Sequence, residues 1–151
     1  MAGALGHAGV YSLRMATHQH GHKPDSQTRS AEADIRAALE GSRRCLDAFC
    51  ADSNSVALLA EASTALAESL RSGGRLLVCG NGGSMAQAMH FAEELSGRFR
   101  ADRRPLAAIA CTDAGHITCT ANDYGFNAVF TRWVEAMACP GAALVCLYTS
   151  G

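Results

Sequence analysis

The sequence predicts an α/β fold in which helices flank a sheet of parallel strands. Three short apolar runs, at 75–79, 106–111 and 142–148, have the length and composition of buried strands. Segments with helical periodicity lie before the first run and between the runs. Strands that alternate with helices are typical of parallel sheets with right-handed crossovers.

Two helices are expected before the first strand, as an N-terminal helical hairpin. The first, within 26–51, has an apolar stripe at Ile35, Leu39, Leu46 and Phe49. The second, at 55–72, would turn Val56, Leu59, Leu66 and Leu70 inward and end at Gly73-Gly74.

After the first strand, helices are expected at 85–95 and 126–137, with a short helix or loop at 113–121. Trp133 lies on the apolar side of the later helix. Pro140-Gly141 ends that helix before the third strand.

Composition excludes several classes of protein. A length of 151 residues suits one domain, and a formal charge of −1 gives no field for binding nucleic acid. No stretch approaches the ~20 apolar residues of a membrane helix. Seven cysteines, an odd number without a CxxC pair, argue against a disulfide scaffold. Cys79, Cys111 and Cys146 end apolar runs, where cysteine packs as a small hydrophobe. These features predict a cytoplasmic protein without nucleic-acid or membrane partners.

Residues 1–25 are expected to form a disordered leader before a domain at 26–151. The segment lacks the basic lead-in of a signal peptide, and either Met1 or Met15 could be the start. Its alternating histidines, at 18, 20 and 22, are interpreted as part of this leader rather than as a metal site.

The first candidate site is the turn Gly80-Asn81-Gly82-Gly83-Ser84, between a strand and a helix. Backbone amides and the helix N-terminus would meet there, which suits a phosphate or another anion. Met85 breaks the dinucleotide fingerprint GxGxxG, and the P-loop lysine is absent. A plain structural turn remains the alternative.

The second candidate site is one face of the following helix, which carries Gln87, His90 and Glu94. The i, i+4 spacing lets His90 and Glu94 bind one divalent ion or act as a proton-transfer pair. An ordinary exposed pair is equally compatible with this spacing.

Polar residues also follow the second and third strands. Asp113 could hold hydroxyl groups or cap the next segment, and His116 is interpreted as structural. Thr149 and Ser150 suit a second phosphate contact. In parallel sheets, ligands gather at the carboxyl ends of the strands.

Three segments together carry a resemblance: CGNGGSMAQAMHFAEELSGRFR, the later CTDAGHITCTANDYGFNAVFTRWVEA, and the terminal LYTSG. They resemble the phosphoheptose isomerases of the sugar isomerase (SIS) superfamily, most strongly over Cys79–Glu135. The resemblance implies a three-layer, SIS-type (flavodoxin-like) fold and a cytosolic homotetramer, with zinc in the site of many members. It also implies interconversion of a ketose phosphate and an aldose phosphate through an enediolate, in the synthesis of lipopolysaccharide heptoses.

The resemblance implies roles for individual residues. Substrate contacts are implied at Asn81, Gly82, Gly83, Ser84, Glu94, Asp113, Thr149 and Ser150. His90 and Glu94 would ligate zinc, and Glu94 would also be the catalytic base.

The sequence departs from the family in two ways. Relatives commonly carry Asp where this chain has Gln87, and the family's later strands, second zinc-binding histidine and glutamine lie beyond position 151. We therefore expect the 151-residue chain by itself to be inactive or poorly folded. The alternative function is a non-catalytic SIS module that binds phosphosugars or a protein partner such as a replication initiator.

Overall fold

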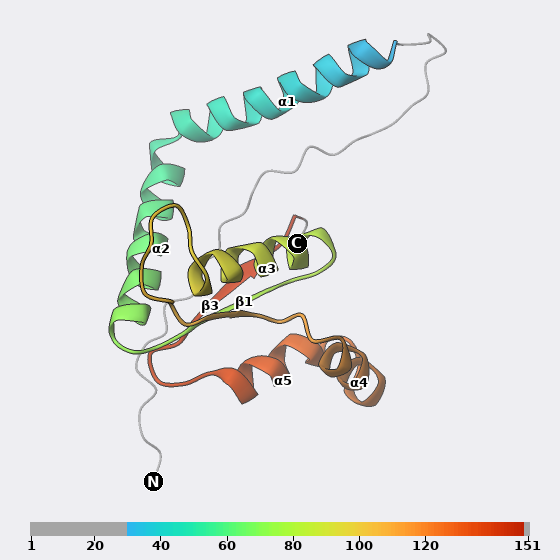
Figure 1. Ribbon diagram of the computed structural model, residues 1–151. Helices are drawn as coiled ribbons and strands as arrows, with labels where there is room; N and C mark the ends of the chain where they lie inside the picture. The colour runs from blue at the N-terminus through green and yellow to red at the C-terminus, as the bar shows by residue number, and fades with distance from the viewer. Residues whose placement is uncertain (1–29, 150–151) are drawn as a thin grey trace. The chain divides into compact units, whose positions relative to one another are not determined.

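The computed structural model describes residues 30–149, so the expected leader and Ser150 lie outside the described residues. Its elements follow in chain order: α1 (Ala31–Ala51), α2 (Ser53–Arg71), β1 (Leu76–Gly80), α3 (Gly83–Ser96), β2 (Ala108–Ala110), α4 (Ala114–Tyr124), α5 (Ala128–Met137) and β3 (Ala143–Leu147) (Figure 1). The chain divides into two compact units, one ending at Ala62 and the other beginning at Ser63.

The first unit contains α1 and the beginning of α2. Ser30 caps α1, because its hydroxyl oxygen accepts a hydrogen bond from the amide of Ala33 at 3.3 Å. Arg43 lies between Glu40 and Asp47 on the polar side of α1 and forms ion pairs with both, at 2.7 and 2.6 Å. Along the apolar stripe of α1, Ile35, Leu39 and Leu46 are exposed and Phe49 is half-buried. The prediction of two N-terminal helices is confirmed.

The second unit contains the end of α2, where the glycine pair lies as expected. Gly73 takes a φ of +85°, and Gly74 packs against the turn at Gly141, whose carbonyl accepts a 2.6 Å hydrogen bond from Ser69. Leu66 and Leu70 are half-buried, but Val56 and Leu59 are exposed. The expected inward face therefore extends over only the last turns of α2.

The sheet is parallel, with strand order β2-β1-β3. Leu77 pairs with Ile109 on one side and with Leu144 on the other. Five apolar or small residues in succession form β1, and all are buried. A central strand covered on both faces needs this uniform composition, so the prediction of a buried parallel strand is confirmed.

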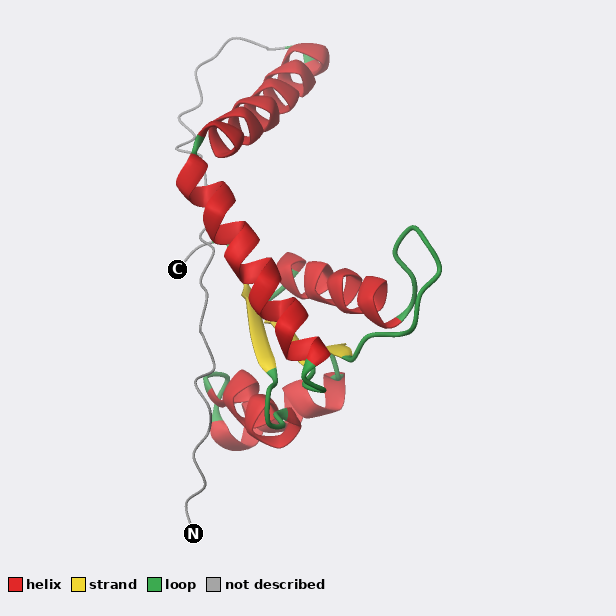
Figure 2. Ribbon diagram, turned by 90° about the vertical axis from the view of Figure 1, so that its left-hand side faces the viewer, coloured by secondary structure: helices red, strands yellow, loops and turns green. Residues whose placement is uncertain are grey.

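Helices cover both faces of the sheet, which gives three layers (Figures 1 and 2). On one face, Val78 packs with Ala88 and Ala92 of α3. On the other face, Leu77 packs with Cys111 and with Trp133 of α5. The face under α3 is thus packed with small residues, and the face under α5 contains the buried indole of Trp133.

The two outer strands differ from the expectation of buried strands. Residues in β2 and β3 alternate between half-buried and exposed. Both strands lie at edges of the described sheet, so each has a sheet neighbour on one side only. No helix among residues 30–149 has the length and hydropathy of a membrane span.

Candidate functional site

The glycine turn connects the carboxyl end of β1 to the first turn of α3. Gly82 has φ 54° and ψ −121°, in the region that favours glycine. The amide of Ser84 donates to the carbonyl of Asn81 at 3.0 Å, and that of Met85 donates to Gly82 at 3.0 Å. The chain thus turns sharply into α3, and the partial positive charge of the helix N-terminus lies at the carboxyl end of β1.

Three elements meet tightly at Gly80. A Cβ atom on this residue would lie 2.8 Å from the carbonyl oxygen of Leu147 on β3 and 2.8 Å from Cβ of Ser84 on α3. Only glycine therefore allows the backbone of β1 to pass between the end of β3 and the start of α3. This close approach places the carboxyl ends of β1 and β3 beside the glycine turn.

A pocket of about 540 Å³ opens at this junction. It brings together three residues that the sequence singled out, Asn81, Ser84 and Thr149. Ser84 is buried, and the other two are exposed. These three residues offer one amide and two hydroxyl side chains next to a helix N-terminus, a combination that suits a hydroxyl-rich anion.

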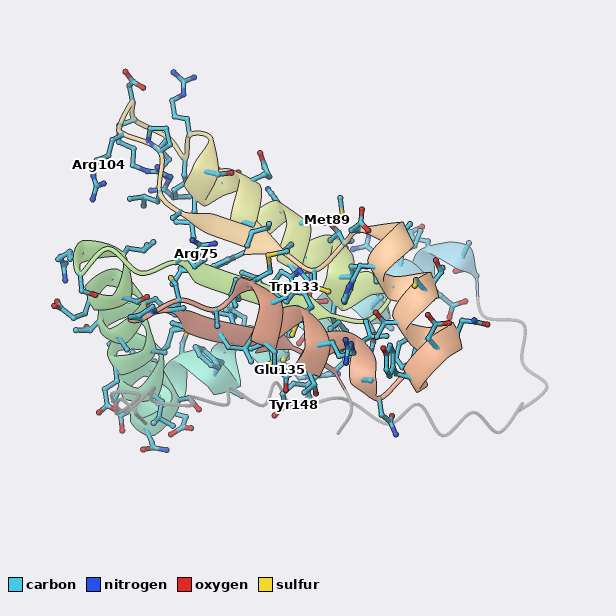
Figure 3. All side chains as sticks on the ribbon, turned by 90° about the horizontal axis from the view of Figure 1, so that it is seen from below. Arg75, Met89, Arg104, Trp133, Glu135 and Tyr148 are labelled. Atoms are coloured by element: carbon cyan, nitrogen blue, oxygen red, sulfur yellow. The ribbon has the colours of Figure 1, made fainter. Side chains whose placement is uncertain are left out.

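Glu135 and Tyr148 also line this pocket, and sequence reasoning missed both (Figure 3). Glu135 reaches it from α5, one helical turn after Thr131, which lines the same wall. A polar pair with i, i+4 spacing on a mostly apolar helix was the signal that could have found Glu135.

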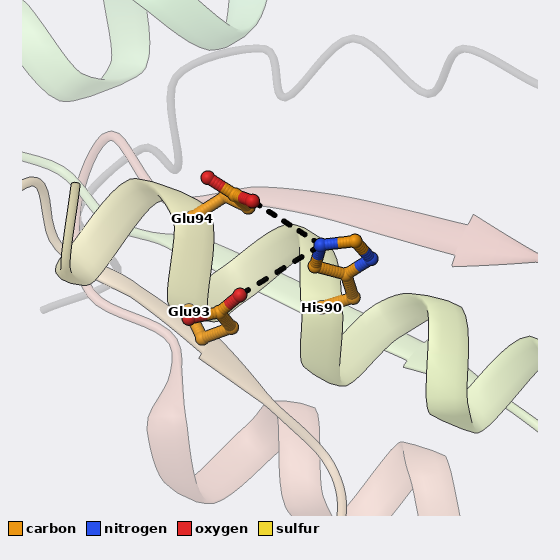
Figure 4. A group of neighbouring side chains, drawn as sticks. All are labelled: His90, Glu93 and Glu94. Carbon is orange, nitrogen blue, oxygen red and sulfur yellow. Dashed lines mark hydrogen bonds and ion pairs between the residues drawn. The ribbon is translucent and has the colours of Figure 1, made fainter. Parts of the chain in front are cut away.

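The metal-ligand candidates lie further along α3 (Figure 4). Nε2 of His90 lies 3.2 Å from Oε1 of Glu94 and 3.8 Å from Oε1 of Glu93. The side chains of His90 and Glu93 are 71% and 68% exposed, whereas that of Glu94 is 31% exposed. The predicted pair is therefore in contact, and Glu93 joins it as a third donor that sequence reasoning did not single out.

The chemistry of these three donors fits a zinc ion. One ligand atom from each of His90, Glu93 and Glu94 lies within 4.8 Å of the others. Tetrahedral zinc with bonds of about 2.0–2.2 Å spaces its ligand atoms about 3.4 Å apart. The 3.2 Å between His90 and Glu94 is already near this spacing. Imidazole nitrogens and carboxylate oxygens are both ligands that zinc takes in proteins.

The structure does not gather all predicted site residues in one place. Gly82, Gly83, His90, Glu94 and Asp113 are not among the residues that line the pocket at the glycine turn. Along α3, Glu94 lies ten residues beyond Ser84, or about 15 Å at the helical rise. The turn and the His90–Glu94 pair thus lie apart along one helix.

Asp113 caps α4. Its carboxylate accepts a 2.6 Å hydrogen bond from the amide of His116. Nε2 of His116 in turn contacts the carbonyl oxygen of Val129 at 3.0 Å, which agrees with the structural interpretation of this histidine. The capping alternative for Asp113 is therefore present, and its contact with sugar hydroxyls stays a prediction.

Arg103 holds the carboxyl end of α3, a contact that sequence reasoning did not foresee. Its guanidinium donates to the carbonyls of Glu94 at 2.6 Å and Leu95 at 2.8 Å. Carbonyls in the last turn of a helix have no partner within the helix, so a cation there satisfies them and complements the dipole. Arg103 thereby fixes the backbone that carries Glu94.

Comparison with known proteins extends these observations. The sequence model of the family described as SIS domain matches residues 40–151. The phosphoheptose isomerase of Tolumonas auensis is 45% identical over 117 residues, which cover 78% of this chain and 61% of the relative. That of Shigella dysenteriae serotype 1 is 46% identical with the same coverage. The chain thus spans about three fifths of the length of these relatives.

Solved structures give the same result. A phosphoheptose isomerase from Francisella tularensis superimposes with a TM-score of 0.74 at 33% identity, over 81% of this chain and 63% of that one. The isomerase GmhA from Neisseria gonorrhoeae gives 0.69 at 34% identity, over 80% and 62%. These matches confirm the three-layer fold and the predicted resemblance. The chain belongs to the SIS domain family.

Proposed function

We propose that this chain supplies the anion-binding turn and the catalytic base of a sedoheptulose 7-phosphate isomerase. The observation that carries the proposal is that one helix, α3, has both features. The helix begins at a glycine turn that opens into a pocket with polar side chains at its mouth, and it carries a hydrogen-bonded His90–Glu94 pair. The relatives named phosphoheptose isomerase support the same reaction.

In this proposal, the pocket at the glycine turn binds the phosphate of the sugar. The amide of Gly83 at the start of α3 and the side chains of Asn81, Ser84 and Thr149 donate hydrogen bonds to phosphate oxygens. Gly82 and Gly83 have no side chains that would cover this amide, and we propose Ser150 as a further contact to the phosphate. Asp113 would accept hydrogen bonds from sugar hydroxyls.

Glu94 acts as the base. Its carboxylate takes a proton from C1, next to the C2 carbonyl, which gives the enediolate, and then returns a proton to C2. The hydroxyl proton passes from the C1 oxygen to the C2 oxygen, so the carbonyl moves from C2 to C1. The product is D-glycero-D-manno-heptose 7-phosphate. Arg103 keeps the backbone at Glu94 in place through its 2.6 Å hydrogen bond. A general base of this kind contributes about 10²–10⁴-fold to the rate.

His90 and Glu94 would hold the zinc ion that the family implies. Bound there, zinc supplies a positive charge that stabilises a developing oxyanion. Glu93, 3.8 Å from the imidazole, is available as a further donor. Zinc titration of this chain, compared with His90→Ala, measures whether the donors bind the ion without any assay of turnover.

We further propose that the protein acts in the cytoplasm as a homotetramer. Its product would enter the synthesis of the heptose precursors of lipopolysaccharide. The exposed apolar stripe of α1, at Ile35, Leu39 and Leu46, supports an assembly that covers it.

The second candidate is a non-catalytic module that binds phosphosugars or a protein partner such as a replication initiator. The observation that favours it is the exposure of His90, because a proton-transfer site is usually shielded from water. Thermal stabilisation by a heptose phosphate without any turnover would support this alternative.

The experiment uses a chimera in which residues 1–151 are followed by the remaining segment of the Tolumonas auensis relative. We expect the chimera to convert sedoheptulose 7-phosphate to the aldoheptose phosphate. Glu94→Gln should lower kcat by at least about 10²-fold, as expected for loss of a general base. Glu61→Gln is the control, because it changes an exposed carboxylate on α2, outside the site, and should retain most of the activity.

Two results would contradict the proposal. A folded chimera that binds the substrate without converting it would favour the non-catalytic module. Equal activity of Glu94→Gln and Glu61→Gln would remove Glu94 from the role of base.

A further inference from the structure

Two cysteines lie side by side in the wall of the pocket. Cys79 on β1 and Cys146 on β3 are register partners on neighbouring strands, and their Sγ atoms are 3.5 Å apart. Both residues line the pocket that contains Asn81 and Ser84. The pair therefore lies within the candidate site, and the proposed isomerase reaction uses neither thiol.

The two thiols differ in their access to solvent. Cys79 is 4% exposed and packs with Leu77 and Trp133 in the core beneath α5. Cys146 is exposed, because the side chains of β3 alternate between half-buried and exposed positions and Cys146 takes an exposed one. The expectation that Cys146 packs as a small hydrophobe is therefore wrong. A small solute in the pocket meets Cys146 before Cys79.

The contact also makes the two thiols chemically unequal. A hydrogen bond from Cys79 stabilises the thiolate of Cys146 and lowers its pKa to about 7. The same contact, together with burial, raises the pKa of Cys79. Glu135 and Tyr148 are the other titratable side chains in this pocket wall. Near neutral pH, Cys146 is thus the nucleophile of the pair, and Cys79 keeps its proton.

We propose that Cys146 is a peroxide-reactive modification site in the pocket and that Cys79 is its resolving thiol. The Cys146 thiolate attacks one oxygen of a hydroperoxide. The O–O bond breaks, an S–O bond forms, and the leaving oxygen departs as water or an alcohol once protonated. Cys79 then attacks the sulfenic acid, the S–O bond breaks, and water leaves. Two thiols and one peroxide thus yield one disulfide, with the peroxide reduced.

The backbone already permits this bond. Hydrogen-bonded strands lie about 4.7–4.9 Å apart, within the roughly 4.4–6.8 Å that disulfides span between Cα atoms. The sulfurs must approach from 3.5 Å to about 2.05 Å. Rotation of the exposed Cys146 side chain can supply this movement, since Cys79 is held by its neighbours in the core.

A rate comparison tests the nucleophile. At pH 7, a thiol with a pKa of about 7 is half ionised, about 15-fold more than one with the ordinary pKa near 8.5. The lower basicity of the thiolate reduces its nucleophilicity about 5-fold, so a net gain of about 3-fold remains. Alkylation by iodoacetamide should therefore modify Cys146 about 3-fold faster than an ordinary exposed thiol. Cys119 is the matched comparison, because its hydrogen bond to Asp123 raises its pKa and should make it slower still.

A cross-link experiment tests the resolving role. The 151-residue protein is treated with hydrogen peroxide, its remaining thiols are alkylated, and it is digested with trypsin without reduction. Mass spectrometry should find the peptide 76–98 joined to the peptide 133–151. Because the second peptide also contains Cys139, the assignment needs Cys139→Ser as a control.

The cross-link should persist in Cys139→Ser and disappear in Cys146→Ser and in Cys79→Ala. A wild-type digest without the linked peptide overturns the proposal, as does a link that survives Cys146→Ser. Cys79→Ala removes a buried side chain and could lose the cross-link by unfolding. The alkylation rates of Cys146 and Cys119 in the unaltered protein therefore test independently whether Cys146 is the reactive thiol. Equal rates at pH 7 overturn the assignment of Cys146 as the reactive thiol.

Discussion

Replacing Gly80 with alanine is expected to lower the free energy of unfolding by about 1–3 kcal/mol. The new Cβ would lie 2.8 Å from the carbonyl oxygen of Leu147 and 2.8 Å from Cβ of Ser84. Both atoms belong to regular elements, β3 and the first turn of α3, so neither can move aside by rotating a side chain. The added methyl group must therefore push two packed elements apart.

The size of this effect follows from the distances. Ordinary van der Waals contact begins at about 3.4 Å, so each neighbour must retreat by about 0.6 Å. Backbone shifts of this kind in a packed core cost about 1–3 kcal/mol. For a chain of this length, each kcal/mol corresponds to about 2–4 °C in Tm, which gives a decrease of roughly 2–12 °C.

Gly83→Ala provides the control within the same turn. A Cβ atom at Gly83 would meet nothing within 4 Å, and the residue already lies in the first turn of α3. Alanine is favoured over glycine in a helix by about 0.5–1 kcal/mol. This variant should therefore be as stable as the unaltered chain or slightly more stable.

The assay is urea unfolding followed by the fluorescence of Trp133. This residue is the only tryptophan in the sequence, and it is buried between α5 and the sheet. The reasoning is refuted if Gly80→Ala unfolds at the same urea concentration as the unaltered chain. It is also refuted if Gly83→Ala is destabilised as much as Gly80→Ala.

Three further variants test the packing and the helix ends. Trp133→Ala should cost about 3–5 kcal/mol in thermal or urea unfolding followed by circular dichroism, because a buried indole leaves a large cavity; a loss below 1 kcal/mol would contradict the packing. Asp113→Ala should destabilise the protein by about 1 kcal/mol and speed amide exchange in α4, whereas Asp113→Asn keeps a capping oxygen and should not. Arg103→Ala should cost about 1–2 kcal/mol and speed amide exchange in the last turn of α3, because two carbonyls lose a charged donor. The neighbouring exposed residue Arg104 gives the matched control, and equal effects of Arg103→Ala and Arg104→Ala would remove Arg103 from its capping role.

Local patterns in the sequence predicted the elements that depend on neighbours along the chain. The uniformly apolar run at 75–79 indicated a buried strand, and β1 is buried throughout. The i, i+4 spacing of His90 and Glu94 predicted their contact, which measures 3.2 Å. Both features are fixed by the period of one strand or one helix, so a single segment contains the whole signal.

Features that depend on tertiary arrangement were harder to predict. The runs at 106–111 and 142–148 resemble β1 in composition, but strand order places them at the edges of the described sheet. Glu135 reaches the pocket only because α5 packs across the face next to β3. The proximity of Cys79 and Cys146 likewise arises from the register of β1 against β3. The pattern of residues along one strand does not determine which strand lies next to it or in which register the two strands pair.

The strand order also governs how this sheet can assemble during synthesis. Cys79 in the central strand and Cys146 in its partner are 67 residues apart in the chain. At about 5–20 residues per second, the ribosome needs roughly 3–13 s to make the segment between them. Throughout that interval, one side of the most apolar strand lacks its hydrogen-bonding partner and is a template for pairing with other chains. The nascent chain thus passes through a period of seconds in which a chaperone that covers β1 would limit aggregation.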